Sequence, residues 1–425
     1  NGFMSFQGTR FDLTGAPSVA FPLSVSEVLA TDDFVSVYLA FSDAYLTMLA
    51  ASAGAIGIEF DYLGTGESSD FPRSYLTQNP VETGSVVSWL AAQRYVKKAT
   101  QGCTMLRNEA ITSGWSLGGT TVVWGTAALQ TIGVEIKRAF SKSAPYDPTL
   151  GTWLAFLLVA QTAQAGGTLS ASAVFFGTFL FASFSNEMPF LSNTGTGQKI
   201  LGPAWRDEAD LDNNLLYLYF VEKPLRDDLL AQVPTNAGLL LTSLFDPSYA
   251  SEAFTALQAV ANGDSLLENV PCQPDYINAG ITAICQAYEE NNAYNVLAEA
   301  DYPVEWCHSE SDTTVVYLFS AALSGLGNDN IVQYEPPLDF LTPTVTSHRE
   351  SSIFCLSAET SFFAMDDGSF FFNNAVTESS SGKKGGNSKN CPACLDSSDS
   401  SSFSTKMKGK KGAESDGPGL CAVHL

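Results

Sequence analysis

The sequence predicts an α/β protein with a mostly parallel central sheet that is flanked by helices. Strand and helix patterns alternate over residues 1–148 and again over 301–375, and strands that alternate with helices build a parallel sheet. The intervening stretch 149–300 has a mostly helical pattern. Hydrophobic residues make up 45% of the 425 residues, so the chain can bury a substantial core. We therefore expect one sheet whose two segments are separated by a helical insertion.

The N-terminal third of the chain contains the clearest strand and helix patterns. The apolar run 53–62 ends in a loop rich in Gly and Ser and predicts a buried strand. Residues 81–99 place apolar side chains such as Val86, Val87 and Leu90 at helical spacing. Further strands are expected at 2–8, 109–115 and 134–144, with a helix after Ser116.

The middle of the chain begins with an unusually apolar run. Residues 148–186 contain no charged residue. Gln161, Gln164 and other polar residues interrupt the run, so we expect two apolar helices joined at Gly166-Gly167 rather than a membrane span. The stretch 149–300 as a whole is predicted to form a helical cap over the sheet.

The C-terminal region returns to alternation and then loses it. A strand over 301–312, a helix over 315–327 and a strand over 330–336 are followed by a final helix at 351–365. After about residue 376 the chain is rich in Ser, Gly and Lys, and such a segment is expected to be disordered. The predicted organisation is therefore a first core segment over residues 1–148, a cap over 149–300, a second core segment over 301–375 and a tail over 376–425.

Charge and cysteine content restrict the partners and the compartment. The formal net charge of −24 argues against binding to nucleic acid or to an anionic membrane. The pairs Cys272–Cys285 and Cys307–Cys355 read as disulfides, which indicates secretion or a vacuolar or secretory compartment. Cys391 and Cys394 form a lone CxxC without a second metal-ligand pair, so we expect no metal and no cofactor. Because the chain opens on a strand-like run, we also expect that N-terminal strands of the fold precede residue 1.

The most informative motif is 114-GWSLGG-119, which lies between a predicted strand and a predicted helix. A G-x-S-x-G motif in this context is typical of a sharp strand-to-helix turn that exposes a nucleophilic serine. Small residues around Ser116 are needed because larger ones would collide with the neighbouring strand and helix. We therefore expect Ser116 to be a nucleophile.

A nucleophilic serine needs a base and an acid, and the chain has three histidines. His424 lies in the predicted tail, and His308 lies at a predicted strand end. His348 lies in a predicted loop between the last strand and the last helix, where the order Ser, Asp, His places the base. Asp312 is the favoured acid because one helix and one strand fit between it and His348. Asp246, which also follows an apolar run, is kept as the competing acid.

An oxyanion formed on the substrate needs two N–H donors. We expect one from the backbone of Leu117, next to the nucleophile, and one from the Gly8–Thr9 region after the first strand. Trp115 and the aromatic residues of the apolar run, Phe156, Phe176 and Phe179, are the expected substrate contacts.

The motifs resemble, over about residues 1–365, those of the secretory-lipase family of alpha/beta-hydrolases. The segments 61-DYLG-64 and 114-GWSLGG-119 match the family pattern, and Pro303, His308, Asp312, Val315 and Tyr317 match the segment around the family's acid. Gln7 stands in 7-QGT-9 where the family typically has His, and the tail after 376 has no counterpart. The resemblance implies a helical cap with an apolar flap over an acyl site.

The expected function is that of a serine ester hydrolase of lipase-like type with a Ser-Asp-His triad. Its partners would be a small-molecule or lipid ester and, transiently, a lipid interface; the oligomeric state is left open. Two alternatives stay open. One is a serine exopeptidase, for which the carboxylates of 205–212 offer an anchor for a charged substrate terminus. The other is a non-catalytic binding protein on the same fold.

Overall fold

A computed structural model describes the regions of the chain that carry the sheet and its helices. These are residues 1–8, 42–52, 54–68, 75–102, 104–168, 282–312 and 314–334, with isolated positions between 246 and 272 and at 348, 351 and 355. Phe176, Phe179 and the segments 205–212 and 376–425 lie outside the described residues, as does the Phe156 side chain.

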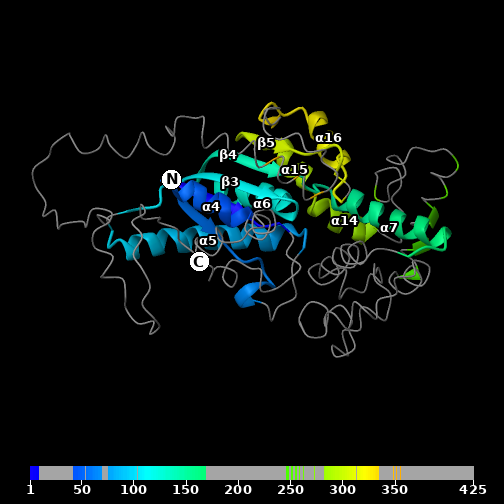
Figure 1. The fold of residues 1–425 in the computed structure, drawn as a ribbon, viewed down its shortest axis with the longest axis horizontal. Helices are drawn as coiled ribbons and strands as arrows, with labels where there is room; N and C mark the ends of the chain where they lie inside the picture. Colours follow the sequence, from blue (N-terminus) through cyan, green and yellow to red (C-terminus); the bar gives the residue numbers. More distant parts are fainter. Residues whose placement is uncertain are drawn as a thin grey trace, which may run out of the picture.

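The centre of the fold is a sheet of six described strands with the order β2-β1-β3-β4-β5-β6 (Figure 1). Every described strand pair is parallel, which confirms the predicted fold class. The strands are β1 (Gly2–Phe6), β2 (Ile56–Glu59), β3 (Glu109–Trp115), β4 (Glu135–Lys142), β5 (Val304–Cys307) and β6 (Ile331–Gln333).

Helices cover both faces of the sheet, which is why its central strands are almost continuously buried. A Cβ on Gly2 of β1 would collide with Trp89 of α5 (Gln78–Ala99), whereas one on Gly57 of β2 would collide with Thr47 of α4 (Ser42–Ser52). Phe3, which pairs with Gly57 in register, neighbours Gly2 and therefore points to the other face. α4 thus lies on the opposite face of the sheet from α5.

The helix after Ser116, α6 (Leu117–Thr131), packs beside α5 and against β3 and β4. The remaining helices among the described residues are α7 (Pro148–Gln164), α14 (Thr282–Glu290), α15 (Ala293–Ala298), α16 (Leu318–Ala321) and the 3₁₀ turns η2 (Gly66–Ser68) and η5 (Ala322–Gly325). α15 also contacts α6, so chain from the end of the predicted cap covers the same face of the core.

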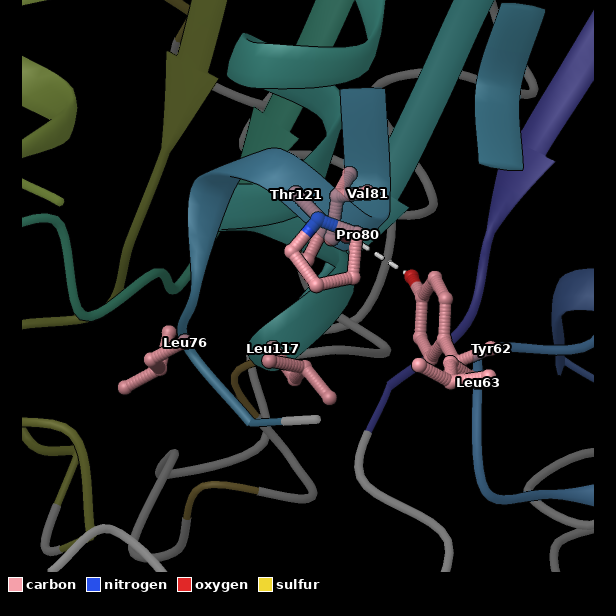
Figure 2. A pocket seen from close by; sticks show the side chains of 7 residues that line it. All are labelled: Tyr62, Leu63, Leu76, Pro80, Val81, Leu117 and Thr121. Carbon is pink, nitrogen blue, oxygen red and sulfur yellow. Dashed lines mark hydrogen bonds between the residues drawn. The ribbon is translucent and has the colours of Figure 1, made fainter. Parts of the chain in front are cut away.

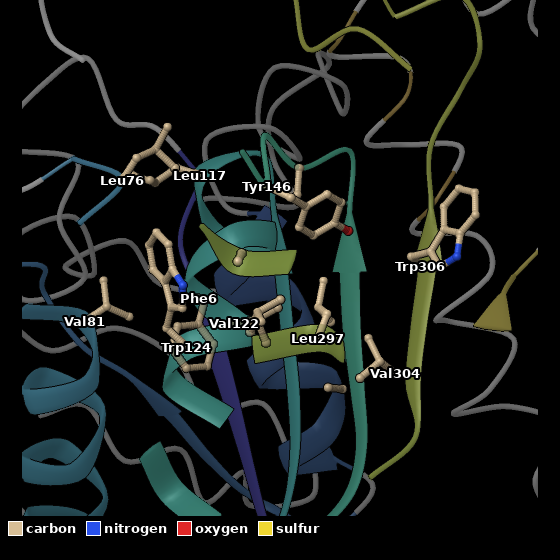
Figure 3. Close-up of a cluster of buried hydrophobic side chains, with 14 of the residues drawn as sticks. Phe6, Leu76, Val81, Leu117, Val122, Trp124, Tyr146, Leu297, Val304 and Trp306 are labelled. Carbon is tan, nitrogen blue, oxygen red and sulfur yellow. The ribbon is translucent and has the colours of Figure 1, made fainter. Parts of the chain in front are cut away.

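One hydrophobic core joins the sheet to α5, α6 and α15 (Figure 3). Phe6, Trp124 and Leu297 are each fully buried in it, although they come from β1, α6 and α15. Because this core holds both ends of the described chain on one sheet, the strands after residue 300 are fixed relative to β3. This is what positions residues of the second core segment next to Ser116.

The predicted helices and strands between residues 78 and 142 are present in the structure, with small differences at their ends. The predicted helix at 315–327 begins later, at Leu318, and ends as a 3₁₀ turn, and α4 was not predicted. The apolar run begins as α7, and the positive φ of Gly166 (65°) marks the chain just after its end. Within the regions of the chain that the structure covers, no helix combines the length and the apolar character that a membrane crossing needs.

Both predicted disulfides are present. Cys272 and Cys285 have a Cα–Cα distance of 5.0 Å, and Cys307 and Cys355 one of 5.5 Å. The second pair ties the end of β5 to the helical residues that follow His348.

Candidate active site

Ser116 occupies a strained turn between β3 and α6. Its φ of 59° and ψ of −122° lie in a region that non-glycine residues rarely adopt. The turn is held by hydrogen bonds from the Ser116 N–H to the Lys142 carbonyl at 2.9 Å and from the Gly119 N–H to the Ser116 carbonyl at 2.9 Å. Strain of this kind is typical of a nucleophile elbow, because it aims the hydroxyl out of the strand end.

The glycines around Ser116 are required by close backbone contacts. A Cβ on Gly114 would lie 2.0 Å from the carbonyl oxygen of Gly118, and one on Gly118 would lie 2.1 Å from the carbonyl oxygen of Phe6. A Cβ on Gly119 would lie 2.6 Å from the carbonyl oxygen of Lys142. The elbow is therefore wedged between β1 and β4, as the sequence pattern indicated.

His348 connects Ser116 to Asp312. Its Nε2 lies 2.8 Å from Ser116 Oγ, and its Nδ1 lies 2.6 Å from Asp312 Oδ2. A carboxylate only accepts hydrogen bonds, so Nδ1 carries the proton, and in the neutral ring Nε2 then accepts from the serine hydroxyl. The three side chains that the sequence singled out are thus brought together across 232 residues of chain.

Asp312 is buried and is held by further donors. Its Oδ1 accepts from the N–H groups of Thr314 at 2.9 Å and Val315 at 3.0 Å. Burial by itself raises the pKa of Asp312, but hydrogen bonds from His308 and His348 outweigh it and bring the pKa below its ordinary value. The competing acid, Asp246, is also buried, but the carboxylate at hydrogen-bond distance from His348 is that of Asp312.

His308 is a support for Asp312 that the sequence did not assign. Its ring is fully buried, with Nε2 3.2 Å from Asp312 Oδ2 and 2.8 Å from the Val315 carbonyl. Because that carbonyl only accepts, Nε2 carries a proton. The other ring nitrogen lies 2.7 Å from Ser320 Oγ. His308 therefore holds the turn that carries the acid, and the spacing of four residues to Asp312 was the available signal.

His348 is held by an aromatic contact and by the helical residues that follow it. Its ring stacks on Trp115, with centroids 4.9 Å apart and planes at 28°. His348 was expected in a loop but is helical, as are Ser351 and Cys355, which at this spacing share one helix face. Ser351 Oγ lies 2.7 Å from Ser143 Oγ and accepts from the Ser309 N–H at 3.0 Å. Local helical geometry, rather than a free loop, therefore aims the imidazole.

The region expected to stabilise an oxyanion lies at the ends of β1 and β3. Leu117 is the first residue of α6, where backbone N–H groups have no partner inside the helix. Gln7 precedes Gly8, and its side chain donates to the Phe60 carbonyl at 2.7 Å. Gly8 lies against Trp115, since a Cβ on it would be 2.7 Å from that ring. Thr9 is outside the described residues.

The strand order also points to this place. β2 and β3 lie on opposite sides of β1, so the chain reverses its direction across the sheet between β1 and β3. In open α/β sheets, ligands bind outside the carboxyl ends of the strands at such a reversal. Gly8 and Ser116 follow these two strands.

Comparisons with known proteins identify the fold of this chain but do not assign it to a sequence family. No protein-family model and no curated protein matches the sequence. Among solved structures, a Legionella pneumophila protein assigned as a hydrolase is 18% identical, with 87% of this chain and 80% of that chain covered and a TM-score of 0.53. The rice cell wall degrading esterase LipA from Xanthomonas oryzae is 16% identical, with 86% and 80% covered and a TM-score of 0.51.

At these identities the likeness concerns the fold and not the substrate. The two neighbours share the parallel sheet with flanking helices over most of both chains. The chain therefore has the alpha/beta-hydrolase fold, and its solved structural neighbours include an esterase.

Proposed function

We propose that this protein hydrolyses carboxylic esters through a covalent acyl-enzyme intermediate on Ser116. The observation that carries the proposal is the continuous hydrogen-bonded series from Ser116 Oγ through the His348 ring to Asp312 Oδ2, with distances of 2.8 and 2.6 Å. The strained elbow supports it further, because residues held in sparsely populated backbone regions cluster at active sites.

In the first step, Ser116 Oγ attacks the ester carbonyl carbon. His348 Nε2 accepts the hydroxyl proton, and the ring becomes an imidazolium. Asp312 stays ionised, because its pKa is held below the ordinary value, and it stabilises that cation through Nδ1–H. The Trp115 ring beneath the imidazole keeps it in the plane that both hydrogen bonds need.

The carbonyl oxygen becomes an oxyanion in the tetrahedral intermediate. We assign its stabilisation to the Leu117 N–H and to the backbone of the Gly8–Thr9 region. Loss of one such donor typically costs 10²–10³-fold in kcat. The N-terminus of α6 adds a favourable dipole for the developing negative charge.

Collapse of the intermediate releases the alcohol and leaves the acyl group on Ser116. His348 Nε2 returns its proton to the departing oxygen, so the leaving alcohol forms on the His348 side. Water then attacks the acyl-enzyme with the same imidazole as base, and the acid is released.

The lipase-like aspect of the proposal concerns the apolar run. Phe156, Phe176 and Phe179 are proposed to line the acyl path, with a lipid ester or lipid interface as the partner. The two disulfides suit an oxidising compartment, so we propose that the protein works in the secretory pathway or outside the cell. The exopeptidase and binding-protein alternatives gain no support from the described residues.

The proposal is tested with p-nitrophenyl esters and an aminoacyl-anilide panel. Turnover should be confined to the esters, and Ser116→Ala should lower kcat by several orders of magnitude while thermal unfolding stays unchanged. A serine-directed fluorophosphonate should transfer its phosphonyl group, with loss of HF, to the peptide that contains Ser116 and to no other. Retention of a tenth of the parent activity by Ser116→Ala would remove Ser116 as the nucleophile.

A further inference from the structure

An apolar pocket opens beside the first turn of α6, next to Ser116 in the chain (Figure 2). Leu76, which precedes α5, and Pro80 and Val81, from its first turn, form one wall. Tyr62 and Leu63, from the segment after β2, form the other. Leu117 and Thr121 of α6 lie between them. Part of the space between these side chains is open to solvent.

The pocket and the acid–base pair lie on opposite sides of Ser116. Ser116 follows β3, in the middle of the described sheet, whereas Asp312 follows β5 and His348 comes after β6. Tyr62 and Leu63 follow β2, at the other edge of that sheet. The pocket is thus reached from the side of Ser116 that faces away from His348.

The direction of the reaction decides which portion of an ester this side receives. His348 Nε2 must reach the leaving oxygen to protonate it, so the alcohol portion lies toward His348. The oxyanion faces the N–H of Leu117. The remaining substituent of the carbonyl carbon is the acyl chain, and it is directed away from His348, toward the pocket.

The lining of the pocket selects an apolar group. The Tyr62 hydroxyl donates to the Gln7 carbonyl at 3.0 Å and lies 2.7 Å from Thr121 Oγ1, so its hydrogen-bonding capacity is already used. The other lining side chains are aliphatic. A hydroxylated or charged group would find no partner there and would lose its hydration, which makes its binding unfavourable.

The backbone at Leu76 is a second sign of a built site. Leu76 has a φ of 54° and is 4% exposed. A leucine in the left-handed region costs roughly 1–2 kcal/mol, and such positions cluster at ligand-binding sites. The unusual conformation places the Leu76 side chain in the pocket wall (Figure 2).

We infer that this pocket binds the first carbons of an unbranched, unsubstituted acyl chain of the ester. The inference rests on the proposed ester hydrolysis and adds the place and the chemistry of the acyl subsite. It differs from the expected path along Phe156, Phe176 and Phe179, because the wall is built from the segment after β2 and the start of α5.

The size of the pocket limits how many carbons of the acyl chain it can bury. The space between the lining side chains is small and partly open to solvent, so it receives the first few carbons of a chain rather than a long tail. Each buried methylene should raise kcat/KM about fourfold. We expect kcat/KM to rise by on the order of tenfold from acetate to butyrate, which adds two methylenes, and to level off at the chain length that fills the pocket.

The test compares p-nitrophenyl acetate, butyrate, hexanoate, octanoate and decanoate, which share one leaving group. Val81→Phe fills the pocket, and Val87→Phe is its matched control, since Val87 lies on the same helix and is 58% exposed. The hexanoate-to-acetate ratio of kcat/KM should fall at least tenfold in Val81→Phe and stay unchanged in Val87→Phe. Leu76→Gly fits the positive φ and enlarges the pocket, so its plateau should move to longer chains.

The outcomes separate this inference from the proposed function. Absence of ester turnover in the parent, or turnover that survives Ser116→Ala, overturns the proposed function and the inference with it. Ser116-dependent turnover whose ratio is the same in a folded Val81→Phe variant overturns the inference alone. If circular dichroism shows that Val81→Phe is unfolded, the Leu76→Gly variant provides the test instead. A plateau of kcat/KM at the same chain length as in the parent would then overturn the inference.

Discussion

Removal of the Cys307–Cys355 disulfide should lower both stability and turnover, because this bond joins the segments that carry the proposed acid and the proposed base. Cys307 ends β5, five residues before Asp312, and Cys355 lies on the helical face shared with His348 and Ser351. We therefore expect the double variant Cys307→Ala/Cys355→Ala to fold but to hold its imidazole less firmly.

The magnitude follows from the length of the closed loop. With a sequence separation of 48, the chain-entropy relation gives about 4 kcal/mol of stabilisation. For a chain of 425 residues, that corresponds to a fall in Tm of roughly 5 °C. The Cys272–Cys285 bond closes only 13 residues and should be worth about 3 kcal/mol.

The activity assay distinguishes bracing of the site from general stabilisation. Well below the Tm of every variant, kcat for p-nitrophenyl butyrate should fall about tenfold in Cys307→Ala/Cys355→Ala, since a displacement of 1 Å at reacting groups costs on the order of a hundredfold. KM should change little. The control variant Cys272→Ala/Cys285→Ala should lose stability by urea unfolding but keep its kcat.

Two results would refute the reasoning. Equal kcat in the parent and in Cys307→Ala/Cys355→Ala would mean that Ser351 and the Trp115 stack hold His348 without the disulfide. A smaller loss of unfolding free energy in this variant than in Cys272→Ala/Cys285→Ala would contradict the entropic account of the magnitude.

Three further predictions concern the elbow, the support of the acid and a buried helix cap. Gly118→Ala forces a Cβ to 2.1 Å from the Phe6 carbonyl oxygen, so β1 must move by about 1 Å and kcat should fall on the order of a hundredfold. His308→Phe removes a donor to Asp312 and should lower kcat about tenfold, since a hydrogen bond to a charged group is worth about 1.5–3 kcal/mol; His308→Gln should recover some of the loss, as measured by kcat at saturating ester. Burial raises the pKa of Asp147, the N-cap of α7, although Thr149 and Leu150 donate to it. Its charge therefore costs folding free energy above the folded pKa, and Asp147→Asn, which keeps the acceptor, should unfold at higher denaturant concentration near pH 7 and lose that advantage below about pH 4.

Each of these predictions has its own control. Gly325→Ala adds a Cβ with no atom within 4 Å and should leave kcat unchanged, so equal kcat for Gly118→Ala and Gly325→Ala would contradict the role given to the elbow contacts. Identical kcat in the Phe and Gln variants of His308 would show that the ring acts only through packing. An Asp147→Asn variant less stable than the parent near pH 7 would show that the cap needs the charge and that burial does not dominate.

Several features could be predicted because their physical cause is local in sequence. Glycines are expected around Ser116 because backbone segments approach one another closely at a strand-to-helix turn. Gly114 and Gly118 do make such close backbone contacts. The parallel sheet follows from the alternation of strand and helix patterns, since a parallel pair requires a crossover. The disulfide pairs followed from spacing and context. These predictions needed no knowledge of which distant segments meet.

The choice between Asp312 and Asp246 was a different kind of question. Both follow apolar runs, and sequence order alone allows either. Only the sheet order, with β5 beside β4, brings Asp312 to His348. Such contacts depend on the order of the strands in the sheet. The residue pattern of one strand does not say which other strand pairs with it.

The sequence by itself determined the fold class, the tight strand-to-helix turn at Ser116 and the order of the three side chains, because periodicity, glycine spacing and chain order are properties of the chain. Only the tertiary structure decided the stacking of Trp115 on His348, the burial of His308 beside Asp312 and the pocket walled by Leu76. Each of these features involves side chains that are far apart in sequence and come into contact only when the core forms. The left-handed backbone of Leu76 is the clearest case, since local propensity opposes it and only the surrounding packing can hold it in place.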